Sequence, residues 1–363
     1  MVYRNNEPYN DLPFLPPAAA LETTAVLRRA ITASRALAEL KGAGNLIPNQ
    51  SILINSIPLQ EARLSSEIEN IVTTQDALFR AAVEEPGRAD APTREVLRYR
   101  TALRRGYDAL QTRPIDIDLI VEVCRVLSDG RATLRDQEPI LIEDVAAGAA
   151  VYTPPRGRAR IVALLQNLTD FLARPGDLDP LIRMAVAHYQ FEAIHPFVDG
   201  NGRTGRILNI LALAQAGLLD LPVLYLSRYI IRHKNDYYRL LQQVRETGEW
   251  EAWILYMLDG VEQTARETVV LIGKIKTLMQ EYKQRIRSGY PKLYSQDLLN
   301  NLFRYPYTKI DYLQKDLDIS RNTAIRYLET LVKEGILSKH RIGRDNYYLN
   351  KPLFDLLKGE ENK

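Results

Sequence analysis

Apolar residues recur at every third or fourth position along most of the first 286 residues, the spacing that places them on one face of an α-helix. The pattern predicts helices over 21–40, 58–70, 93–110, 117–127, 161–172, 179–193, 234–246 and 249–286, with another beginning inside 200–217. That last segment is apolar on every side, so we expect it to lie in the centre of the fold and to end at Gly217. Residues 1–20 are rich in Pro, Asn and Tyr and predict an extended arm.

Two segments depart from this helical pattern. Residues 135–157 combine Ile, Val and Tyr runs with proline breaks, which predicts a short β-hairpin. After a break at 288–291, we expect helices over 294–303, 310–317 and 321–334, then Gly335 and two β-like runs, an order typical of a winged helix-turn-helix. We therefore predict a mainly α fold in three parts. These are a helical region in 1–110, a helical core with the hairpin in 111–285, and a winged helix in 286–363.

Composition narrows the class of protein only slightly. The 363 residues are 46% hydrophobic and 26% charged with a net charge of +3, which fits at least two globular domains and does not indicate nucleic acid. The single cysteine, Cys124, excludes an internal disulfide. We find no run of 18 apolar residues, and the first residues lack the parts of a signal peptide. We expect a cytoplasmic protein that binds no membrane.

The stretch HPFVDGNGRTGR, residues 195–206, gathers residues that carry chemistry. Gly200, Gly202 and Gly205 lie at the predicted start of a helix, where glycine permits close backbone approach and free N–H groups bind anions. Arg203 and Arg206 add guanidinium groups that match phosphate geometry. The stretch predicts a polyphosphate cradle. It differs from a P-loop, because it lacks GK(S/T) and no strand precedes it.

His195 and Asp199 add reactive groups beside this cradle. A neutral imidazole can accept a proton from a hydroxyl, and an aspartate can bind Mg²⁺ together with substrate phosphates. Each residue alone has a plainer explanation: a histidine that caps a helix, an aspartate in a turn, an arginine on a solvated face. Their combination at fixed spacing favours transfer of a phosphorus-centred group to a hydroxyl.

The stretch resembles the signature of the Fic-domain family, His-Pro-Phe-x-(Asp/Glu)-Gly-Asn-Gly-Arg-x-x-Arg, at every specified position. YNDLPFLPP near the N-terminus, VYTPP at the end of the hairpin and the downstream KNDYY also look like Fic proteins, so the resemblance covers roughly residues 1–260. It implies a Fic-type helical bundle and transfer of AMP from ATP to a Ser, Thr or Tyr hydroxyl of a target protein. A kinase or a phosphocholine transferase on the same scaffold stays open.

The resemblance also implies roles for particular residues. His195 would be the general base, and Asp199 would hold Mg²⁺ between the α- and β-phosphates. The hairpin at Val151 and Tyr152 would be a flap that aligns the target segment by strand addition. The two arginines would meet the β- and γ-phosphates, and Tyr237 would lie near the adenine. The full set of ATP-binding residues would be Gly200, Asn201, Gly202, Arg203, Thr204, Gly205, Arg206 and Tyr237.

The stretch LSSEIEN, residues 64–70, also resembles a motif of the same family. Ser65 and Glu69 are four residues apart, hence on one face of the helix predicted at about 58–70. Alone, they favour an ordinary amphipathic surface helix. Yet Ser-x-x-x-Glu-Asn resembles the inhibitory motif of one Fic class, which lies N-terminal to the catalytic core. This implies that Glu69 pairs with Arg206, occupies the γ-phosphate position and slows the enzyme. Whether this chain also removes AMP stays open.

The C-terminal part leaves several partners open. From 319 to 350 the chain has six Lys or Arg and three Asp or Glu, a modest basic excess. Arg321, Asn322 and Arg326 could reach DNA, but protein docking or dimerisation is favoured. The alternative to an enzyme is a transcription regulator whose Fic-like body only senses nucleotide, and the intact His195 favours the enzyme. Expected partners are ATP, an unidentified target protein and the chain itself, with a homodimer and DNA left open.

Overall fold

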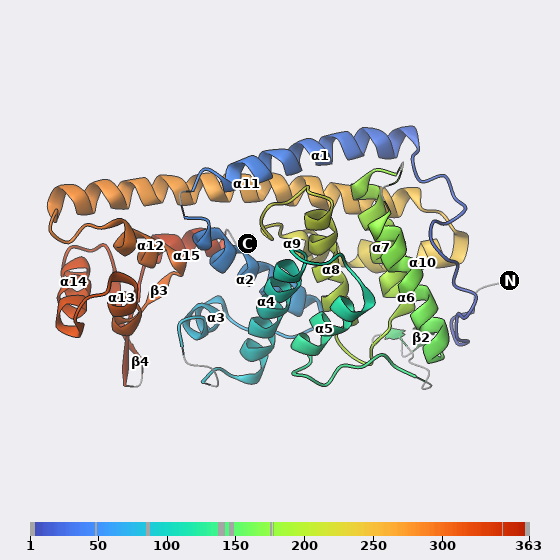
Figure 1. The fold of residues 1–363 in the computed structure, drawn as a ribbon, viewed down its shortest axis with the longest axis horizontal. Helices are drawn as coiled ribbons and strands as arrows, with labels where there is room; N and C mark the ends of the chain where they lie inside the picture. Colours follow the sequence, from blue (N-terminus) through green and yellow to red (C-terminus); the bar gives the residue numbers. More distant parts are fainter. Residues whose placement is uncertain are drawn as a thin grey trace.

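The structure is a computed structural model that describes residues 4–47, 49–84, 88–136, 142–144, 149–174, 176, 178–342 and 344–359. Helices dominate these residues, and the strands are short (Figure 1). Among the described helices, none has the length and apolar composition that a membrane crossing requires. The helices are α1 (Thr24–Gly44), α2 (Ser51–Ile68), α3 (Gln75–Ala81), α4 (Ala91–Ala109), α5 (Ile117–Leu127), α6 (Arg158–Ala173), α7 (Pro180–Ile194), α8 (Asn201–Gln215), α9 (Leu226–Arg232), α10 (Lys234–Thr247), α11 (Glu251–Gly289), α12 (Gln296–Arg304), α13 (Ile310–Leu317), α14 (Arg321–Lys333) and α15 (Lys351–Lys358). The strands are β1 (Ile142–Asp144), β2 (Ala149–Tyr152), β3 (Tyr307–Thr308), β4 (Ser338–Ile342) and β5 (Asp345–Leu349).

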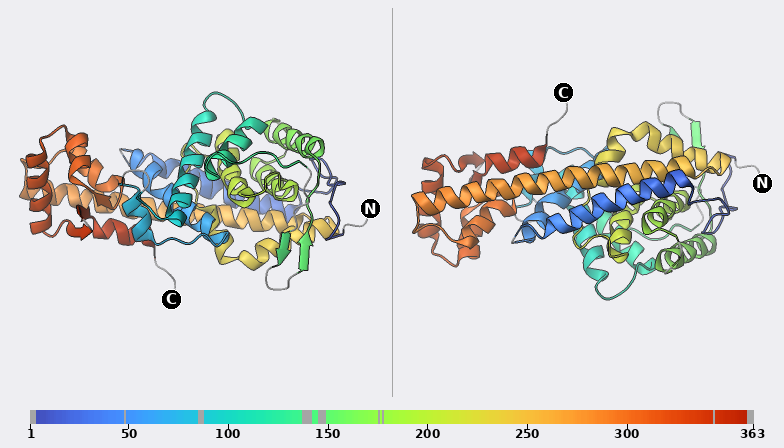
Figure 2. Two further views of the ribbon diagram at one scale, coloured as in Figure 1. Left: turned by 90° about the horizontal axis from the view of Figure 1, so that it is seen from below. Right: turned by 90° about the horizontal axis from the view of Figure 1, so that it is seen from above.

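Two long helices lie side by side along one edge of the molecule, as Figures 1 and 2 show. α11 extends over 39 residues into the C-terminal part, and α1 packs along it. Arg29 of α1 joins the two helices through ion pairs to Asp259 at 2.6 Å and to Glu262 at 3.0 Å. The predicted domain boundary at 285/286 therefore falls inside one continuous helix.

α7 and α8 form the centre of the fold. Every residue of α7 except Pro180 and Arg183 is buried, and α8 packs against it. Trp253 of α11 donates from Nε1 to the Ala185 carbonyl of α7 at 2.9 Å. The prediction that the helix after residue 200 is central is confirmed. Its C-cap is residue 216 rather than Gly217, which follows with a φ of 71°.

α2 begins at Ser51 and not at Pro58 as the sequence predicted, so that Pro58 lies inside the helix. A proline inside a helix lacks one backbone donor and costs about 3 kcal/mol. The helix continues here because apolar side chains on both sides of the proline are fully buried, among them Ile57 and Leu59. Burying such a side chain stabilises the fold by about 1.5–3 kcal/mol. Tertiary packing therefore outweighs the local stop signal.

Three short helices, α3, α9 and α15, were not predicted. They contain 7, 7 and 8 residues, too few turns for a helical period to stand out in the sequence. Packing stabilises them instead. Both Leu226 and Ile230 of α9 are buried, and α9 lies against α2 and α11.

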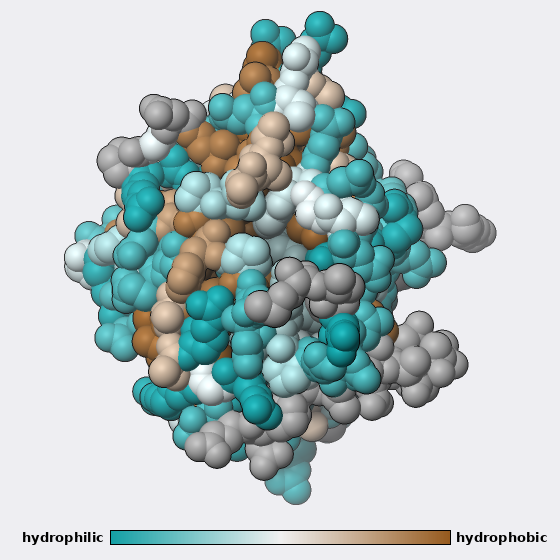
Figure 3. Space-filling model, turned by 90° about the vertical axis from the view of Figure 1, so that its right-hand side faces the viewer, coloured by the Kyte–Doolittle hydropathy of each residue, from teal (hydrophilic) through white to brown (hydrophobic). Residues whose placement is uncertain are grey.

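The N-terminal arm and the hairpin lie together at one end of the molecule. β1 and β2 pair antiparallel, which confirms the hairpin in its described strands, while residues 137–141 and 145–148 lie outside the described chain. The described part of the arm, residues 4–20, contains no helix, and the Tyr9 N–H donates to the Thr153 carbonyl at 3.0 Å. Arg160 of α6 donates to the carbonyls of Asn10 and Leu12 at 2.9 and 2.7 Å. Figure 3 shows this end, where a broken band of apolar residues crosses a mainly polar surface.

The C-terminal part lies at the opposite end and packs on α2 (Figure 1). The helices predicted at 294–303, 310–317 and 321–334 are present with small shifts at their ends. The strands form an antiparallel sheet in the order β3–β5–β4. Ser56 of α2 donates to the Arg304 carbonyl at 2.8 Å, and Tyr305 donates to Asn55 at 3.1 Å. That this part is a winged helix stays a prediction.

We expect Gly205→Ala to lower the free energy of unfolding by about 1–3 kcal/mol. A Cβ at position 205 of α8 would collide with the Glu192 carboxyl and lie 3.0 Å from Cδ1 of Phe191, both on α7. Gly273→Ala in α11 is the matched control, because a Cβ there would meet nothing within 4 Å and alanine favours helix by about 1 kcal/mol. Urea unfolding followed by circular dichroism measures both variants. Equal stabilities would contradict the close packing of α7 on α8.

Candidate active site

His195 lies in the turn between α7 and α8. It is the C-cap of α7 and has left-handed backbone angles, φ 48° and ψ 60°. Asn201 builds the turn that follows. Its Oδ1 accepts from the Phe197 N–H at 2.9 Å, and its Nδ2 donates to the Phe197 carbonyl at 2.8 Å. The resemblance placed Asn201 on the phosphates, whereas in this structure its side chain joins the histidine turn to the start of α8.

The start of α8 is an anion site. Gly200 is its N-cap, with a φ of 85° that favours glycine, and it has no side chain to cap the helix. The free N–H groups of the first turn and the helix dipole attract negative charge. A Cβ at Gly202 would collide with the Glu69 carboxylate and lie 2.9 Å from Nη1 of Arg206. Glycine at position 202 therefore leaves the room that an anion needs beside the helix.

Glu69 supplies that anion in this structure. Nη2 of Arg206 lies 2.9 Å from Oε1 of Glu69, and Arg206 also donates to the hydroxyl and the carbonyl of Ser65 at 2.7 and 2.9 Å. Glu69 is the C-cap of α2, so it lies just beyond the helix and not on its face as predicted. Burial alone would raise the pKa of the Glu69 carboxyl, but the Arg206 guanidinium outweighs burial and lowers it below its usual value. Glu69 is therefore ionised at neutral pH.

Tyr237 lies beneath this ion pair and not at its mouth. Its side chain is buried, and its hydroxyl lies 2.9 Å from Nε2 of His188. The neighbouring Tyr238 is 47% exposed, and burial together with the charge of Glu69 raises its pKa to about 12. Tyr238, which the sequence reasoning missed, is thus the aromatic side chain at the surface of the site. The sequence alone does not show which of two adjacent tyrosines faces the site, because that depends on the orientation of α10.

Arg203 and Asp199 lie on the outer side of the helix start. Nη1 of Arg203 is 3.1 Å from the Glu95 carboxylate of α4, and its Nη2 is 3.5 Å from Asp199. The Asp199 side chain is 81% exposed, and its Oδ1 accepts from the Gly200 N–H at 2.7 Å. Arg203 is therefore already engaged by two carboxylates, while Asp199 remains open to solvent.

Thr204 and Gly205 face the core and not the phosphate cradle. Thr204 is fully buried, and Gly205 packs against Glu192 and Phe191 of α7. These two residues of the signature serve helix packing, and the expectation that they contact ATP stays a prediction. The reason is helical geometry, since only part of the first turn can face the ligand.

The end of the hairpin is attached to the histidine turn. Tyr152 is fully buried and donates to the Ala193 carbonyl at 2.7 Å, so its side chain faces inward and away from a target. Val151 is half-buried. Arg135, which sequence reasoning did not single out, donates to the His195 carbonyl at 2.6 Å. An arginine beside Asp and Gln in a polar segment carries no signal that could have revealed this contact.

The imidazole of His195 is neutral at physiological pH. Burial lowers its pKa to about 4, and the positive charges of Arg135 and Arg245 act in the same direction, whereas Glu69 acts against them. A neutral ring nitrogen can accept a proton. Beneath the site, burial raises the pKa of Glu192 to about 7. The site therefore combines a neutral base with a cationic anion cradle.

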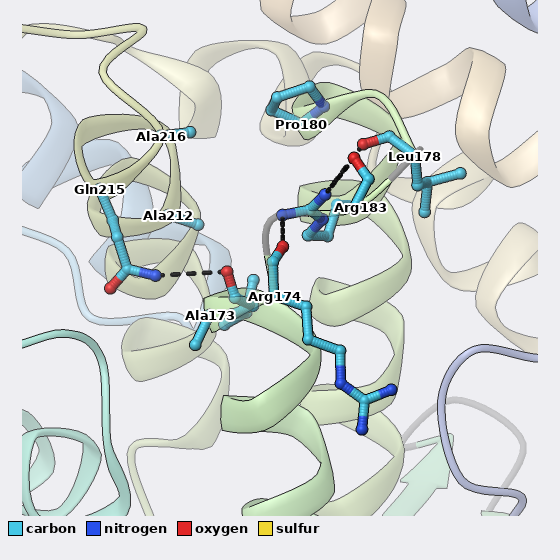
Figure 4. Close-up of a pocket in the computed structure, with 10 residues that line it drawn as sticks. Ala173, Arg174, Leu178, Pro180, Arg183, Ala212, Gln215 and Ala216 are labelled. Carbon is cyan, nitrogen blue, oxygen red and sulfur yellow. Dashed lines mark hydrogen bonds between the residues drawn. The ribbon is translucent and has the colours of Figure 1, made fainter.

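A separate depression of about 520 Å³ lies at the other end of α7 and α8 (Figure 4). Arg183 crosses it and donates to the Leu178 carbonyl at 3.0 Å, and Gln215 faces it from α8. The described residues that line it include no His, Cys, Asp or Glu. We therefore assign no chemistry to this depression.

The fold and the site define a helical protein in which Arg206 holds the Glu69 carboxylate at the start of α8, beside a neutral histidine. Three family models match the chain in succession: "Fic/DOC family N-terminal" over residues 27–108, "Fic/DOC family" over 114–213, and "Protein adenylyltransferase SoFic-like, C-terminal domain" over 278–353. Together these segments make up more than half of the chain. The chain belongs to the Fic/DOC family.

Named relatives match parts of the chain. Protein adenylyltransferase Fic of Drosophila willistoni is 32% identical over 115 residues, 31% of this chain and 22% of that protein. Protein adenylyltransferase fic-1 of Caenorhabditis elegans is 28% identical over 206 residues, 55% of this chain and 38% of that protein. The matched stretches thus span less than half the length of these relatives.

Solved structures share the fold. A Fic family protein from Desulfovibrio desulfuricans G20 aligns with a TM-score of 0.57 at 19% identity, covering 93% of this chain and 98% of that chain. Fic-1 from Caenorhabditis elegans aligns with a TM-score of 0.52 at 22% identity, covering 68% of this chain and 73% of that chain.

We expect the His195 imidazole to titrate near pH 4. Its folded-state pKa lies below the ordinary 6.5, so the stability that it contributes is fully present above pH 6.5 and is lost as the pH falls toward 4. NMR of ring-labelled histidine measures the pKa directly, and the chain has only 4 histidines to assign. A His195→Asn variant identifies the resonance. Titration close to 6.5 would mean that the ring is solvated like a free imidazole and would contradict this prediction.

Proposed function

We propose that this chain is a protein adenylyltransferase that moves AMP from ATP to a Ser, Thr or Tyr hydroxyl of a target protein. The observation that carries this proposal is a neutral, half-buried His195 next to a helix start that already holds an anion against Arg206. The printed names of the relatives, which are protein adenylyltransferases, support the same reaction.

The proposed chemistry uses His195 as the general base. The imidazole accepts the proton of the target hydroxyl while the hydroxyl oxygen attacks the α-phosphorus of ATP. One bond forms between that oxygen and the α-phosphorus, the bond to the bridging oxygen breaks, and diphosphate leaves. A pKa of about 4 keeps the ring unprotonated at neutral pH. The first turn of α8 and the Arg206 guanidinium stabilise the negative charge that collects on the leaving group.

Asp199 fits a Mg²⁺ ion that arrives with the nucleotide. Its carboxylate is 81% exposed beside the start of α8 and accepts one backbone hydrogen bond that holds it in place. In the described chain no group of three or more His, Cys, Asp or Glu side chains could hold a metal by itself. Mg²⁺ commonly uses one or two carboxylates plus substrate phosphates. When bound, the ion would neutralise charge on the phosphates.

The target segment is expected at the hairpin. Strand addition would use the backbone of β2, because the Tyr152 side chain is turned into the core. The target is an unidentified protein, and the chain itself is a further substrate.

Glu69 is the proposed brake on this reaction. Its carboxylate lies at the helix start against Arg206, where a phosphate of ATP would need to lie. A phosphate and the Glu69 carboxylate would repel each other at that position, because both are negatively charged. ATP would then bind in a pose that does not suit in-line attack.

DNA binding is not part of the proposal. Arg321 of the helix-turn-helix forms an ion pair with Asp311, and Lys339 of β4 pairs with Glu329 at 2.6 Å. These pairs neutralise part of the modest basic excess of this surface. They favour a protein-docking role for the C-terminal part.

We expect Glu69→Gly to raise adenylylation and Arg206→Ala to abolish it. Both changes break the same ion pair, but only the first leaves the phosphate its arginine. If the pair were only structural, both variants would lose activity together, because breaking a buried pair can cost about 3–5 kcal/mol. Self-labelling from α-labelled ATP with Mg²⁺ measures transfer, and melting temperatures report stability.

Two controls accompany this test. Arg63→Ala breaks the Arg63–Glu67 pair of the same helix without touching Arg206 and should leave labelling unchanged. His195→Ala in the Glu69→Gly background should lower labelling by roughly 10²–10⁴-fold. A folded Glu69→Gly protein that labels no faster than wild type would remove the brake from the proposal.

Asp199→Ala in the Glu69→Gly background should lose transfer at every Mg²⁺ concentration. The variant removes the only carboxylate of the signature, and the ion then has no protein ligand at the helix start. Titration of labelling against Mg²⁺ measures the effect. Asp118→Ala, which removes an exposed carboxylate of α5, is the matched control. Unchanged Mg²⁺ dependence in Asp199→Ala would place the metal ligand elsewhere.

A further inference from the structure

Four successive carbonyls at the end of α7 accept hydrogen bonds from Arg135 and Tyr152. The last carbonyls of a helix have no partner within the helix, so they need donors from elsewhere. The distances are 2.7 Å from the Tyr152 hydroxyl to Ala193 O, 2.9 Å from Arg135 Nη2 to Ile194 O, 2.6 Å from Arg135 Nε to His195 O and 3.0 Å from Arg135 N to Pro196 O. The turn that carries His195 is thus held by two side chains from outside it.

The Arg135 guanidinium binds the carbonyls that would otherwise stabilise a protonated His195. Carbonyls at a helix C-terminus stabilise a cation, which normally raises the pKa of a histidine there. Here the buried Arg135 guanidinium binds those carbonyls, and its positive charge faces the imidazole. Arg245 adds a second positive charge, with its guanidinium 4.0 Å from the centre of the Tyr152 ring. Glu69 is the negative group that acts on the same ring.

The backbone of His195 needs this support. A φ of 48° is a left-handed conformation that side chains other than glycine adopt rarely. The direction of the imidazole depends on that conformation, because no helical residue follows His195 to fix its backbone. Two hydrogen bonds from one planar guanidinium fix the carbonyls on both sides of the His195 N–H.

One of the two residues belongs to the hairpin. Tyr152 is the last residue of β2, whereas Arg135 precedes β1 in the sequence. The β2 end of the hairpin is therefore attached to the turn that holds His195. A target segment aligned on β2 would be held in register with the base through these contacts.

We propose that Arg135, together with Tyr152, is a positioning pair that fixes the direction of the His195 imidazole and joins it to the hairpin that aligns the target. This inference rests on the proposed function of His195 as the base. It assigns neither residue a contact with ATP or with the reacting atoms.

The test compares Arg135→Gln, Arg135→Lys and Tyr152→Phe. Transfer kinetics use the Glu69→Gly background, and the pKa of His195 is measured by NMR in the wild-type background. Arg160→Gln is the matched control, because Arg160 also donates to two backbone carbonyls, those of Asn10 and Leu12, but lies away from His195. Melting temperatures are recorded for every variant.

We expect Arg135→Gln to lower kcat by roughly tenfold to a hundredfold, with KM for ATP nearly unchanged, since a small displacement of a catalytic group has effects of that size. The pKa of His195 should rise, because a positive charge beside the ring is removed. Arg135→Lys should keep that pKa near about 4 while kcat still falls, because lysine keeps the charge but not the fork of donors. Tyr152→Phe should also lower kcat, although its ring would still stack against Arg245. Arg160→Gln should change none of these values.

Two outcomes would overturn the inference. One is a fall in kcat for Arg135→Gln no larger than that for Arg160→Gln. The other is a fall that tracks a lower melting temperature while the pKa of His195 stays near about 4, which would make Arg135 a structural residue only. Failure of the proposed function looks different. In that case the Glu69→Gly protein with Arg135 intact would transfer no AMP, while the NMR comparison would still report on the position of the ring.

Discussion

The buried charge of Arg206 is the constraint on which the rest of the site depends. The guanidinium is 1% exposed, and an isolated charge at such a depth would cost several kcal/mol. Burial acts against the charged form, but the Glu69 carboxylate outweighs it and holds the pKa of Arg206 above its usual value. Some anion must therefore accompany Arg206. In this structure it is Glu69, and in the proposed active state it is a phosphate of the nucleotide.

That requirement gives a physical reason for the firm attachment of α2. Glu61, in the middle of this helix, is fully buried and accepts hydrogen bonds from the Ser227 N–H at 3.0 Å and from the Tyr99 hydroxyl at 3.1 Å. α2 is thus fastened to α9 and to α4, and the C-terminal part packs on its other side. Glu69 lies just beyond the last helical residue. The helix sets the position of the carboxylate, and Ser65 within the same helix also accepts hydrogen bonds from Arg206.

Residues of the signature divide into those that build the turn and those that face the ligand. Asn201 and Gly205 are structural, the first within the turn and the second between α7 and α8. Gly202 and Arg206 face the anion. A dense signature therefore does not mean that each of its residues touches the nucleotide. Its structural residues also maintain the turn that brings His195, with its left-handed backbone, to the start of α8.

Much of the fold could be read from the sequence, because periodic apolar residues report directly on helices that bury one face. The central helix after residue 200, the hairpin strands and the helices near the C-terminus were predicted in this way. The short helices α3, α9 and α15 and the true start of α2 could not be, since packing stabilises them against weak or contrary local signals such as Pro58.

The sequence by itself determined the chemistry available: a histidine, a carboxylate, glycines and arginines at a spacing that builds an anion site. It also suggested that Glu69 pairs with Arg206, and the structure contains that pair. Only the tertiary structure decided which side chains reach the site. It turned Tyr237 inward and Tyr238 outward, and it brought Arg135 to the carbonyl of His195. These outcomes depend on how helices that are far apart in the sequence orient toward one another. No local pattern of residues determines that orientation.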